Sequence, residues 1–321
     1  MDEWIEQLKV DPRPVLLSSD NQALSYFVRR DLMDQQVEPA GVLWTLPEVE
    51  RITVRQHPDG SWKYSTNQES AEENYDLLET FRVLGQLIEK YGLERQHPAI
   101  QQAADYLFNC QTEEGDFRGI YGMQYSPNYS GAITELLIKG GYEGDSRIEK
   151  SIQWLLSIRQ DDGGWAIPIR TNNIKWEDAP KNPSLLQPNR SKPFSHMVTG
   201  MVLRAFAVHT CYRLSPPAME AGDLLLSRFF APDKYVDRRF KSFWEKTSYP
   251  FWFTDIVSAL DSVTLIGFTP ENEQINAALN WLRDCQIENG LFSIQLLRAR
   301  DKDSICWTCL AICRIFKRLY S

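Results

Sequence analysis

The segment Gln160-Asp-Asp-Gly-Gly-Trp165 contains the turn that decides the fold of this 321-residue chain. It begins with a glutamine, reaches a glycine after three further residues, and ends in an aromatic ring. The same pattern recurs at residues 56–62, 111–117 and 286–292. Glycine allows the left-handed backbone that ends a helix, and the ring can pack over the turn. The glutamine can bond backbone groups that a helix end leaves unpaired, so we interpret the four copies as structural turns.

Helices are predicted on both sides of these turns. Ahead of two turns, apolar residues at i, i+3, i+4 and i+7 run in the same register, from Ile100 to Cys110 and from Ile275 to Cys285. This spacing is typical of an amphipathic helix. A second, almost wholly apolar helix is predicted in each unit. The ranges of these second helices are 75–91, 129–138, 196–211, 253–266 and 306–319.

The spacing of the turns indicates a repeat architecture. The four glutamines are separated by 55, 49 and 126 residues, and the last interval is about two units long. A degenerate unit is therefore expected near residues 225–255. Repeats of roughly 50 to 60 residues, each with one amphipathic and one apolar helix, predict a two-layer helical array.

Two segments fall outside the repeats. Within residues 1–40, Ser19 and Gln22 have the spacing of a capping box, and an apolar helical stripe follows. The stripe consists of Leu24, Phe27, Val28 and Leu32. This helix is expected to supply a sixth element or a closing strap.

Residues 166–193 hold five prolines and no helical period, which indicates a long loop. This loop is either a lid or binding loop or a plain surface insertion. Its candidate contact residues are Arg170, Lys175, Trp176, Arg190 and Lys192.

Composition restricts the classes of function. The net charge of −8 argues against nucleic acid as a partner, because binding to phosphates requires cationic residues. The N-terminus carries acids where a signal peptide would be basic, and no apolar stretch reaches the roughly 20 residues of a spanning helix. The six cysteines show no framework of spacings and are expected to stay thiols. A cytoplasmic protein is predicted.

The turns at 56–62 and 160–165 resemble the QW repeats of squalene–hopene cyclases and related triterpene cyclases. Similar hairpins occur in the β-subunits of protein prenyltransferases. The resemblance runs from about residue 40 to the C-terminus and implies an all-α fold, an α/α toroid with inner and outer rings of helices. Residues 1–321 would form a single domain, with 1–40 as a strap and 166–193 as an insertion. A central cavity would be lined by the N-terminal ends of the inner helices.

The resemblance also implies where catalysis would occur. Triterpene cyclases protonate an alkene with an Asp-x-Asp-Asp motif at the start of an inner helix, and this chain has no such motif. The nearest candidate is Asp255, either as an acid or carbocation counter-ion, or as a carboxylate at a helix N-terminus that interacts favourably with the helix dipole. Aromatic rings facing a dry cavity would stabilise carbocations through their negative faces. The expected cavity residues are Tyr75, Tyr129, His196, Trp252, Phe253, Cys306 and Trp307.

A zinc site is the alternative that the prenyltransferase resemblance implies. That family holds zinc with Asp, Cys and His at inner-helix starts, and His196, Asp255 and Cys306 fall at similar places here. The family's Asp-x-Cys reads Ser304-Ile-Cys306 in this chain, and the order of ligands differs. A buried cysteine is more often a core residue, as the apolar surroundings of Cys309 also indicate. No cofactor is therefore predicted, and zinc stays as an alternative.

The leading prediction is a divergent relative of these enzymes that binds or transforms a hydrophobic, isoprenoid-type molecule. A non-catalytic toroid that binds a lipid or a protein is the second hypothesis. A carbohydrate-active α/α barrel is the third. It would need two opposed carboxylates, and Asp76 is the candidate to pair with Asp255.

Overall fold

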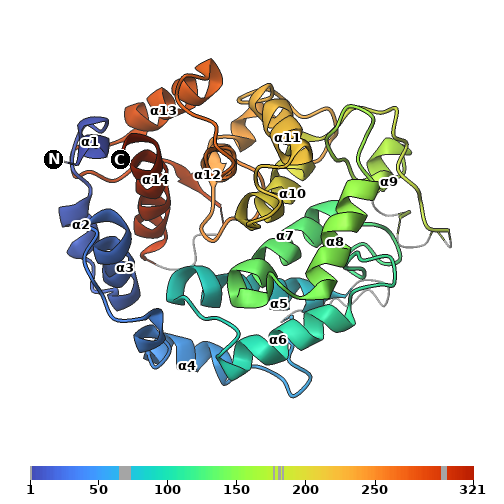
Figure 1. The fold of residues 1–321 in the computed structure, drawn as a ribbon, viewed down its shortest axis with the longest axis horizontal. Helices are drawn as coiled ribbons and strands as arrows, with labels where there is room; N and C mark the ends of the chain where they lie inside the picture. Colours follow the sequence, from blue (N-terminus) through green and yellow to red (C-terminus); the bar gives the residue numbers. More distant parts are fainter. Residues whose placement is uncertain (1, 65–73, 176–177, 180–181, 183, 298–301) are drawn as a thin grey trace.

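The computed structural model describes residues 2–64, 74–175, 178–179, 182, 184–297 and 302–321. Figure 1 shows the helices of these segments in two concentric layers, so the predicted α/α toroid is confirmed. The inner layer consists of α5 (Tyr75–Tyr91), α7 (Pro127–Leu137), α10 (His196–Val208), α12 (Ile256–Leu265) and α14 (Ser304–Tyr320). The outer layer consists of α4 (Pro47–Thr53), α6 (Pro98–Asn109), α8 (Ser146–Ser157), α11 (Pro216–Leu226) and α13 (Glu273–Cys285).

Each outer helix is followed by an inner helix, and neighbouring inner helices contact one another in chain order. Helices α7 and α10 form the most extensive of these contacts. A Cβ atom on Gly131 of α7 would lie 2.7 Å from the Cα atom of Val202, so glycine is required at this crossing.

The shorter elements connect or cover the two layers. The remaining α-helices are α1 (Glu3–Glu6), α2 (Arg13–Leu17), α3 (Gln22–Phe27) and α9 (Pro168–Thr171). Two π-helical turns, η1 (Val28–Leu32) and η3 (Ile138–Tyr142), and two 3₁₀ turns, η2 (Ala40–Leu43) and η4 (Lys241–Phe243), are present. Strands β1 (Lys246–Thr247) and β2 (Gln295–Leu296) pair in parallel. None of the helices in the described segments has the length and apolar character that crossing a bilayer requires.

The turn glutamines join successive units. The side-chain amide of Gln56 donates to the carbonyl of its own turn glycine and to that of Ala99 in α6, both at 2.9 Å. Gln111 makes the equivalent two bonds one unit later. Gln160 instead donates to two carbonyls of the 166–193 loop, which follows its turn directly. The glutamines thus bond carbonyls beyond their own helix end, a connection that the repeat pattern did not predict.

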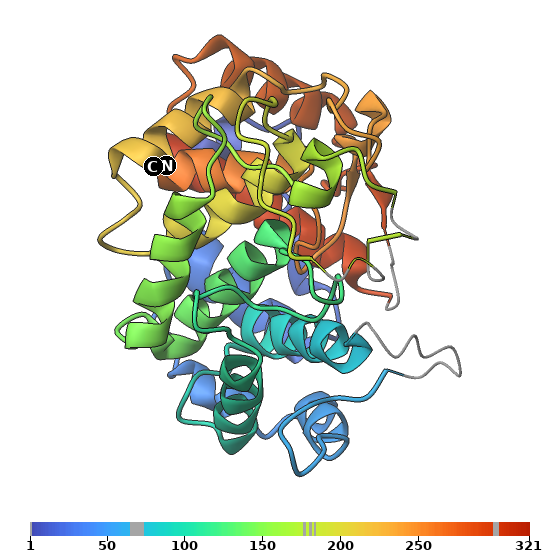
Figure 2. The ribbon, with the colours of Figure 1, turned by 90° about the vertical axis from the view of Figure 1, so that its right-hand side faces the viewer.

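The N-terminal segment closes the ring. The fourth turn glutamine, Gln286, donates to the carbonyl of Val10 at 2.8 Å and accepts from the backbone N–H of Lys9 at 2.7 Å. Arg314 of α14 donates from Nε to the carboxylate of Asp31 in η1 at 2.8 Å. The two termini consequently lie side by side (Figures 1 and 2).

The predicted capping box of the N-terminal helix is wrong. Helix α3 begins at Gln22, and its N-cap is Asn21, whose side chain accepts from the N–H of Leu24 at 2.9 Å. The hydroxyl of Ser19 accepts from the N–H of Asn21 and so supports the cap from outside the helix. The predicted apolar stripe is confirmed, since all four of its side chains are buried.

The unit expected near 225–255 is the α11–α12 hairpin, whose connection is irregular. In place of a glutamine turn, the buried ring of Trp244 donates from Nε1 to the carbonyl of Ala231 at 2.8 Å. The long loop reaches this connection, because Arg170 forms a two-pronged ion pair with Asp237 at 2.5 and 2.6 Å. Trp176 lies outside the described residues.

Candidate functional site

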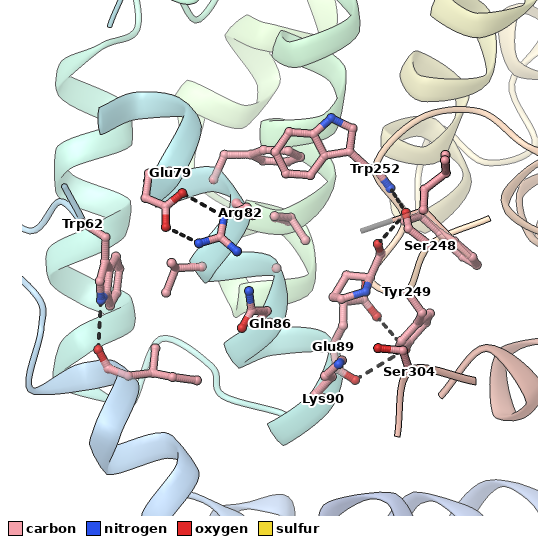
Figure 3. Close-up of a pocket in the computed structure, with 18 of the residues that line it drawn as sticks. Trp62, Glu79, Arg82, Gln86, Glu89, Lys90, Ser248, Tyr249, Trp252 and Ser304 are labelled. Atoms are coloured by element: carbon pink, nitrogen blue, oxygen red, sulfur yellow. Dashed lines mark hydrogen bonds and ion pairs between the residues drawn. The ribbon is translucent and has the colours of Figure 1, made fainter. Parts of the chain in front are cut away.

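A cavity of about 610 Å³ lies between α5 and the segment 248–252 that precedes α12 (Figure 3). The first turns of α14 contribute Ser304 and Thr308 to its wall. Residues far apart in the sequence therefore meet at this site because the toroid brings α5, α12 and α14 around one centre.

Helix α5 turns a polar face to the cavity. Glu79, Arg82, Gln86 and Glu89 follow one another at spacings of three or four residues, and all four line the cavity, as does Lys90. Residues at these spacings lie on one face of a helix. Arg82 donates from Nε to Glu79 at 2.8 Å, so an ion pair occupies the N-terminal part of this face.

The opposite wall is aromatic. Trp252 packs edge-on against Phe81 of α5, with ring centroids 5.4 Å apart, and Tyr249 stacks on Trp307 at 6.0 Å. The hydroxyl of Ser248 accepts from the N–H of Trp252 at 3.2 Å and fixes the bend of this segment. The site thus combines a polar helix face with an irregular aromatic segment (Figure 3).

A network of ion pairs, in which Glu135 and Arg204 are buried, lies next to the polar face of α5. Lys139 of η3 contacts Glu89 at 2.5 Å and Glu135 at 2.8 Å, and Arg204 of α10 donates to Glu135 at 2.8 Å. Burial by itself lowers the pKa of Lys139, but the two carboxylates outweigh this effect and hold the pKa above its usual range. The ammonium therefore stays charged, and both carboxylates have a cationic partner.

Tyr249 extends this network to the strap. Its hydroxyl accepts from Arg314 at 3.0 Å and lies 3.3 Å from a carboxylate oxygen of Glu89. Burial, followed by the charge of Glu89, raises the pKa of Tyr249 above its usual range, so the phenol keeps its proton. Asp31, Arg314, Tyr249 and Glu89 form a continuous polar path from η1 to α5.

One of the seven expected cavity residues, Trp252, lines this cavity. Tyr129 packs edge-on against Phe81, and Trp307 lies behind Tyr249. The other four, Tyr75, His196, Phe253 and Cys306, are also absent from the cavity wall. The assignment of these six residues to a substrate cavity stays a prediction. The cavity follows the body of α5, and Ser304 at the start of α14 also lines it.

Asp255 caps α12. Its carboxylate accepts from the N–H groups of Val257 at 2.9 Å and Ser258 at 3.1 Å, and the Ser258 hydroxyl accepts from the Asp255 N–H at 3.0 Å. Burial raises the pKa of Asp255 to about 7, against the opposing effect of the Ser258 backbone hydrogen bond. Asp255 thus lies at the N-terminus of the helix, as the dipole alternative requires, and it also caps the first turn. Its role as an acid stays a prediction.

The candidate ligands of the zinc alternative, His196, Asp255 and Cys306, do not gather in one group. Among the described residues, His, Cys, Asp and Glu side chains do not gather in groups of three that could hold a metal. His196 Nδ1 lies 3.2 Å from a carboxylate oxygen of Asp233, and its ring stacks on Trp244 at 4.6 Å. Burial lowers the pKa of His196 to about 4. Cys309 and Cys313 are buried on one face of α14, with their sulfurs 4.0 Å apart, as in the core-packing interpretation.

Asp76, the second carboxylate of the carbohydrate hypothesis, does not line this cavity. Asp76 accepts from Lys63 at 2.8 Å and from the N–H of Tyr64 at 3.0 Å, and it is absent from the cavity wall.

Sequence reasoning missed the polar face of α5. The signal was present, because Glu79, Arg82, Gln86 and Glu89 recur at helical spacing inside a helix that the repeats assign to the inner layer. A polar stripe on an inner helix is informative, since such a helix buries most of its surface.

Sequence comparisons identify relatives for part of the chain. The family model described as squalene–hopene cyclase C-terminal domain matches residues 75–179. A probable squalene–hopene cyclase of Sinorhizobium fredii is 30% identical over 108 residues, which cover 33% of this chain and 17% of that protein. The squalene–hopene cyclase of Bradyrhizobium diazoefficiens is 27% identical over 152 residues, which cover 42% of this chain and 23% of that protein. The matched part therefore spans less than a quarter of either relative.

Two solved structures that are similar to this chain over most of its length are variants of the type II terpene cyclase MstE of Scytonema. One variant without ligand has a TM-score of 0.47 and 14% identity, over 87% of this chain and 84% of its own. Another variant, in complex with its substrate geranylgeranyl dihydroxybenzoate, has a TM-score of 0.46 and 15% identity, over 87% and 85%. A protein from Actinoplanes has a TM-score of 0.47 and 16% identity, over 94% and 90%. Residues 75–179 are thus similar to the C-terminal domain of squalene–hopene cyclases.

Proposed function

We propose that this chain binds an isoprenoid-type molecule in the cavity between α5 and the segment 248–252. The observation that carries the proposal is the presence of three buried rings in the cavity wall, namely Trp62 and the contacting pair Phe81 and Trp252. Their faces and edges offer apolar surface to a ligand without the rotamer entropy that a flexible side chain would lose.

The size of the cavity supports a ligand of this class. Small-molecule sites typically have volumes of roughly 300 to 1,000 Å³, and this cavity has about 610 Å³. The relationship to squalene–hopene cyclases favours an isoprenoid over other apolar ligands of similar size.

Calorimetric titration with the C15 isoprenoid alcohol farnesol tests the proposal. We expect saturable binding to the unmodified chain, and a loss of about 2 kcal/mol or more in binding free energy for Trp252→Ala, because a central aromatic contact is removed. Trp281→Ala in the outer helix α13 is the matched control and should bind as the unmodified chain does. Equal affinity in all three proteins, or no binding to any of them, would refute the site.

Catalysis at Asp255 is a second candidate function. Its support is a buried carboxyl with a pKa of about 7, three residues beyond Trp252. A group with this pKa can hold a proton near neutral pH and deliver it. We expect Asp255→Asn to abolish any cyclised product detected by gas chromatography and mass spectrometry, while asparagine preserves the cap. Unchanged product formation by that variant would eliminate Asp255 as the acid.

A further inference from the structure

The two walls of the cavity differ in chemistry. Segment 248–252 presents the rings of Tyr249, Phe251 and Trp252, whereas α5 presents a stripe of charged and amide side chains beside the ring of Phe81 (Figure 3). A ligand between them therefore meets hydrogen-bonding groups only on the side of α5.

The charged side chains on the polar face of α5 have partners within the protein, and the Nζ atom of Lys90 lies 5.6 Å from the ring centroid of Trp307. Arg82 neutralises Glu79, and Lys139 neutralises Glu89, which also lies within hydrogen-bonding distance of the Tyr249 hydroxyl. An ionised ligand would have to compete with these short contacts. The balance therefore favours a ligand whose polar group is neutral.

Gln86 is the exception on this face. It lies on α5 between Arg82 and Glu89 and lines the cavity (Figure 3). No hydrogen bond joins its side chain to another residue in the described segments, although an amide offers two donors and an acceptor. Its polar atoms are thus available to whatever fills the cavity.

A pure hydrocarbon is a poor partner for this amide. Filling the cavity with hydrocarbon would remove water from the amide of Gln86 and leave its donors and acceptor unpaired, which weakens binding. A neutral oxygen on the ligand would restore the lost hydrogen bonds. A site rejects a ligand that lacks the polar group strongly when one of the site's own polar groups would then stay unpaired.

We propose that the cavity selects an oxygenated, uncharged isoprenoid, such as a prenyl alcohol, over the corresponding hydrocarbon, and that Gln86 hydrogen-bonds the ligand oxygen. This inference rests on the proposed function, since it names the class of isoprenoid that the same cavity accepts. Trp252 and Phe81 contact the hydrocarbon part of the ligand, and Gln86 hydrogen-bonds the oxygen at its polar end.

Comparison of farnesol with the C15 hydrocarbon farnesene tests this selectivity. Both are titrated calorimetrically from cyclodextrin into the full chain. We expect farnesol to bind at least about tenfold more tightly, which corresponds to ~1.4 kcal/mol. In Gln86→Leu the preference should shrink to less than about threefold, because leucine has a similar volume and no amide. Gln101→Leu on the exposed face of α6 is the control and should keep the full preference.

Each outcome decides between the two proposals. Equal or tighter binding of farnesene, or an unchanged preference in Gln86→Leu, overturns the selectivity while the proposed site stands. Binding of neither ligand refutes the proposed function itself. If Gln86→Leu fails to fold, as thermal unfolding would reveal, Gln86→Met takes its place with the same expected loss of preference.

Discussion

Helices α5 and α12 are both inner helices, and both begin at a side-chain cap. They differ in whether their polar side chains line the cavity. Asn74 caps α5 by accepting from one backbone N–H of the first turn, and Asp255 caps α12 by accepting from two. Beyond the cap, α5 carries polar side chains to the cavity. The hydroxyls of α12 instead return to its own backbone, as Ser262 does to the carbonyl of Ser258 at 2.9 Å.

This difference separates packing from ligand contact. The one ionisable side chain at the start of α12 is occupied by its helix, whereas α5 keeps a stripe of groups in the cavity wall. A carboxylate at a helix start is therefore weak evidence of catalysis by itself. A polar stripe along an inner helix is stronger evidence of a binding site.

The largest expected effect concerns the charges behind α5. Arg204→Ala leaves the buried Glu135 with one cation fewer, and loss of one partner of a buried ion pair typically costs about 3 to 5 kcal/mol. The side chains of Arg204 and Glu135 are 3% and 5% exposed. Urea unfolding at neutral pH measures the loss.

An exposed pair provides the control for this variant. Arg51 contacts Glu48 at the surface of α4, and we expect Arg51→Ala to change the free energy of unfolding by less than about 1 kcal/mol. If Arg204→Ala and Arg51→Ala lowered the free energy of unfolding equally, the ion pairs next to α5 would stabilise the fold no more than a surface pair does.

A smaller effect, dependent on pH, is expected at the start of α12. The pKa of Asp255 is about 7 in the folded chain and about 3.9 in an unfolded one. The folded state therefore holds the proton more tightly, and the contribution of Asp255 to stability falls as pH rises from about 4 to about 7. Asp255→Asn lacks this loss, so its stability relative to the unmodified chain should increase between pH 4.5 and pH 7.5.

Urea unfolding at the two pH values checks this prediction. A constant difference between Asp255→Asn and the unmodified chain would contradict a raised pKa. Asp255→Ala removes the cap as well and should be less stable than Asp255→Asn by about 1 kcal/mol. Farnesol affinity should be the same for Asp255→Asn and the unmodified chain if α12 only packs.

The smallest effect is expected at the Glu79–Arg82 pair of α5. Ion pairs three residues apart on a helix contribute about 0.2 to 0.5 kcal/mol. Glu79→Gln should therefore lower the free energy of unfolding by no more than about 0.5 kcal/mol. A loss above 2 kcal/mol would mean that the polar face holds α5 in place, instead of being held there for a ligand.

Much of the architecture could be predicted because repeats encode local structure. Helix α5 has the bounds that the sequence predicts, 75–91, and Gln56 and Gln111 bond backbone carbonyls of their own turns. The rings of Trp62 and Trp165 pack over their turns and donate to carbonyls of the preceding helix. Periodicity and turn chemistry decide such features over short distances in the chain.

The site depends on long-range placement that periodicity does not contain. Glu135 and Arg204 are 69 residues apart in the sequence, and Tyr249 and Glu89 are 160 residues apart. The bend of segment 248–252 turns Trp252 into the cavity, whereas the neighbouring Phe253 is absent from its wall. An irregular segment offers no repeat from which the orientation of its rings could be read.

Photocrosslinking with a diazirine analogue of farnesol tests the central claim most directly, namely that the ligand lies between α5 and segment 248–252. After irradiation and digestion, mass spectrometry locates the labelled residues. The predicted labels fall in 79–90 and 248–252 and disappear when excess farnesol is added. Competed labelling at the start of α12 or on the outer helices, with none on α5, would contradict the account.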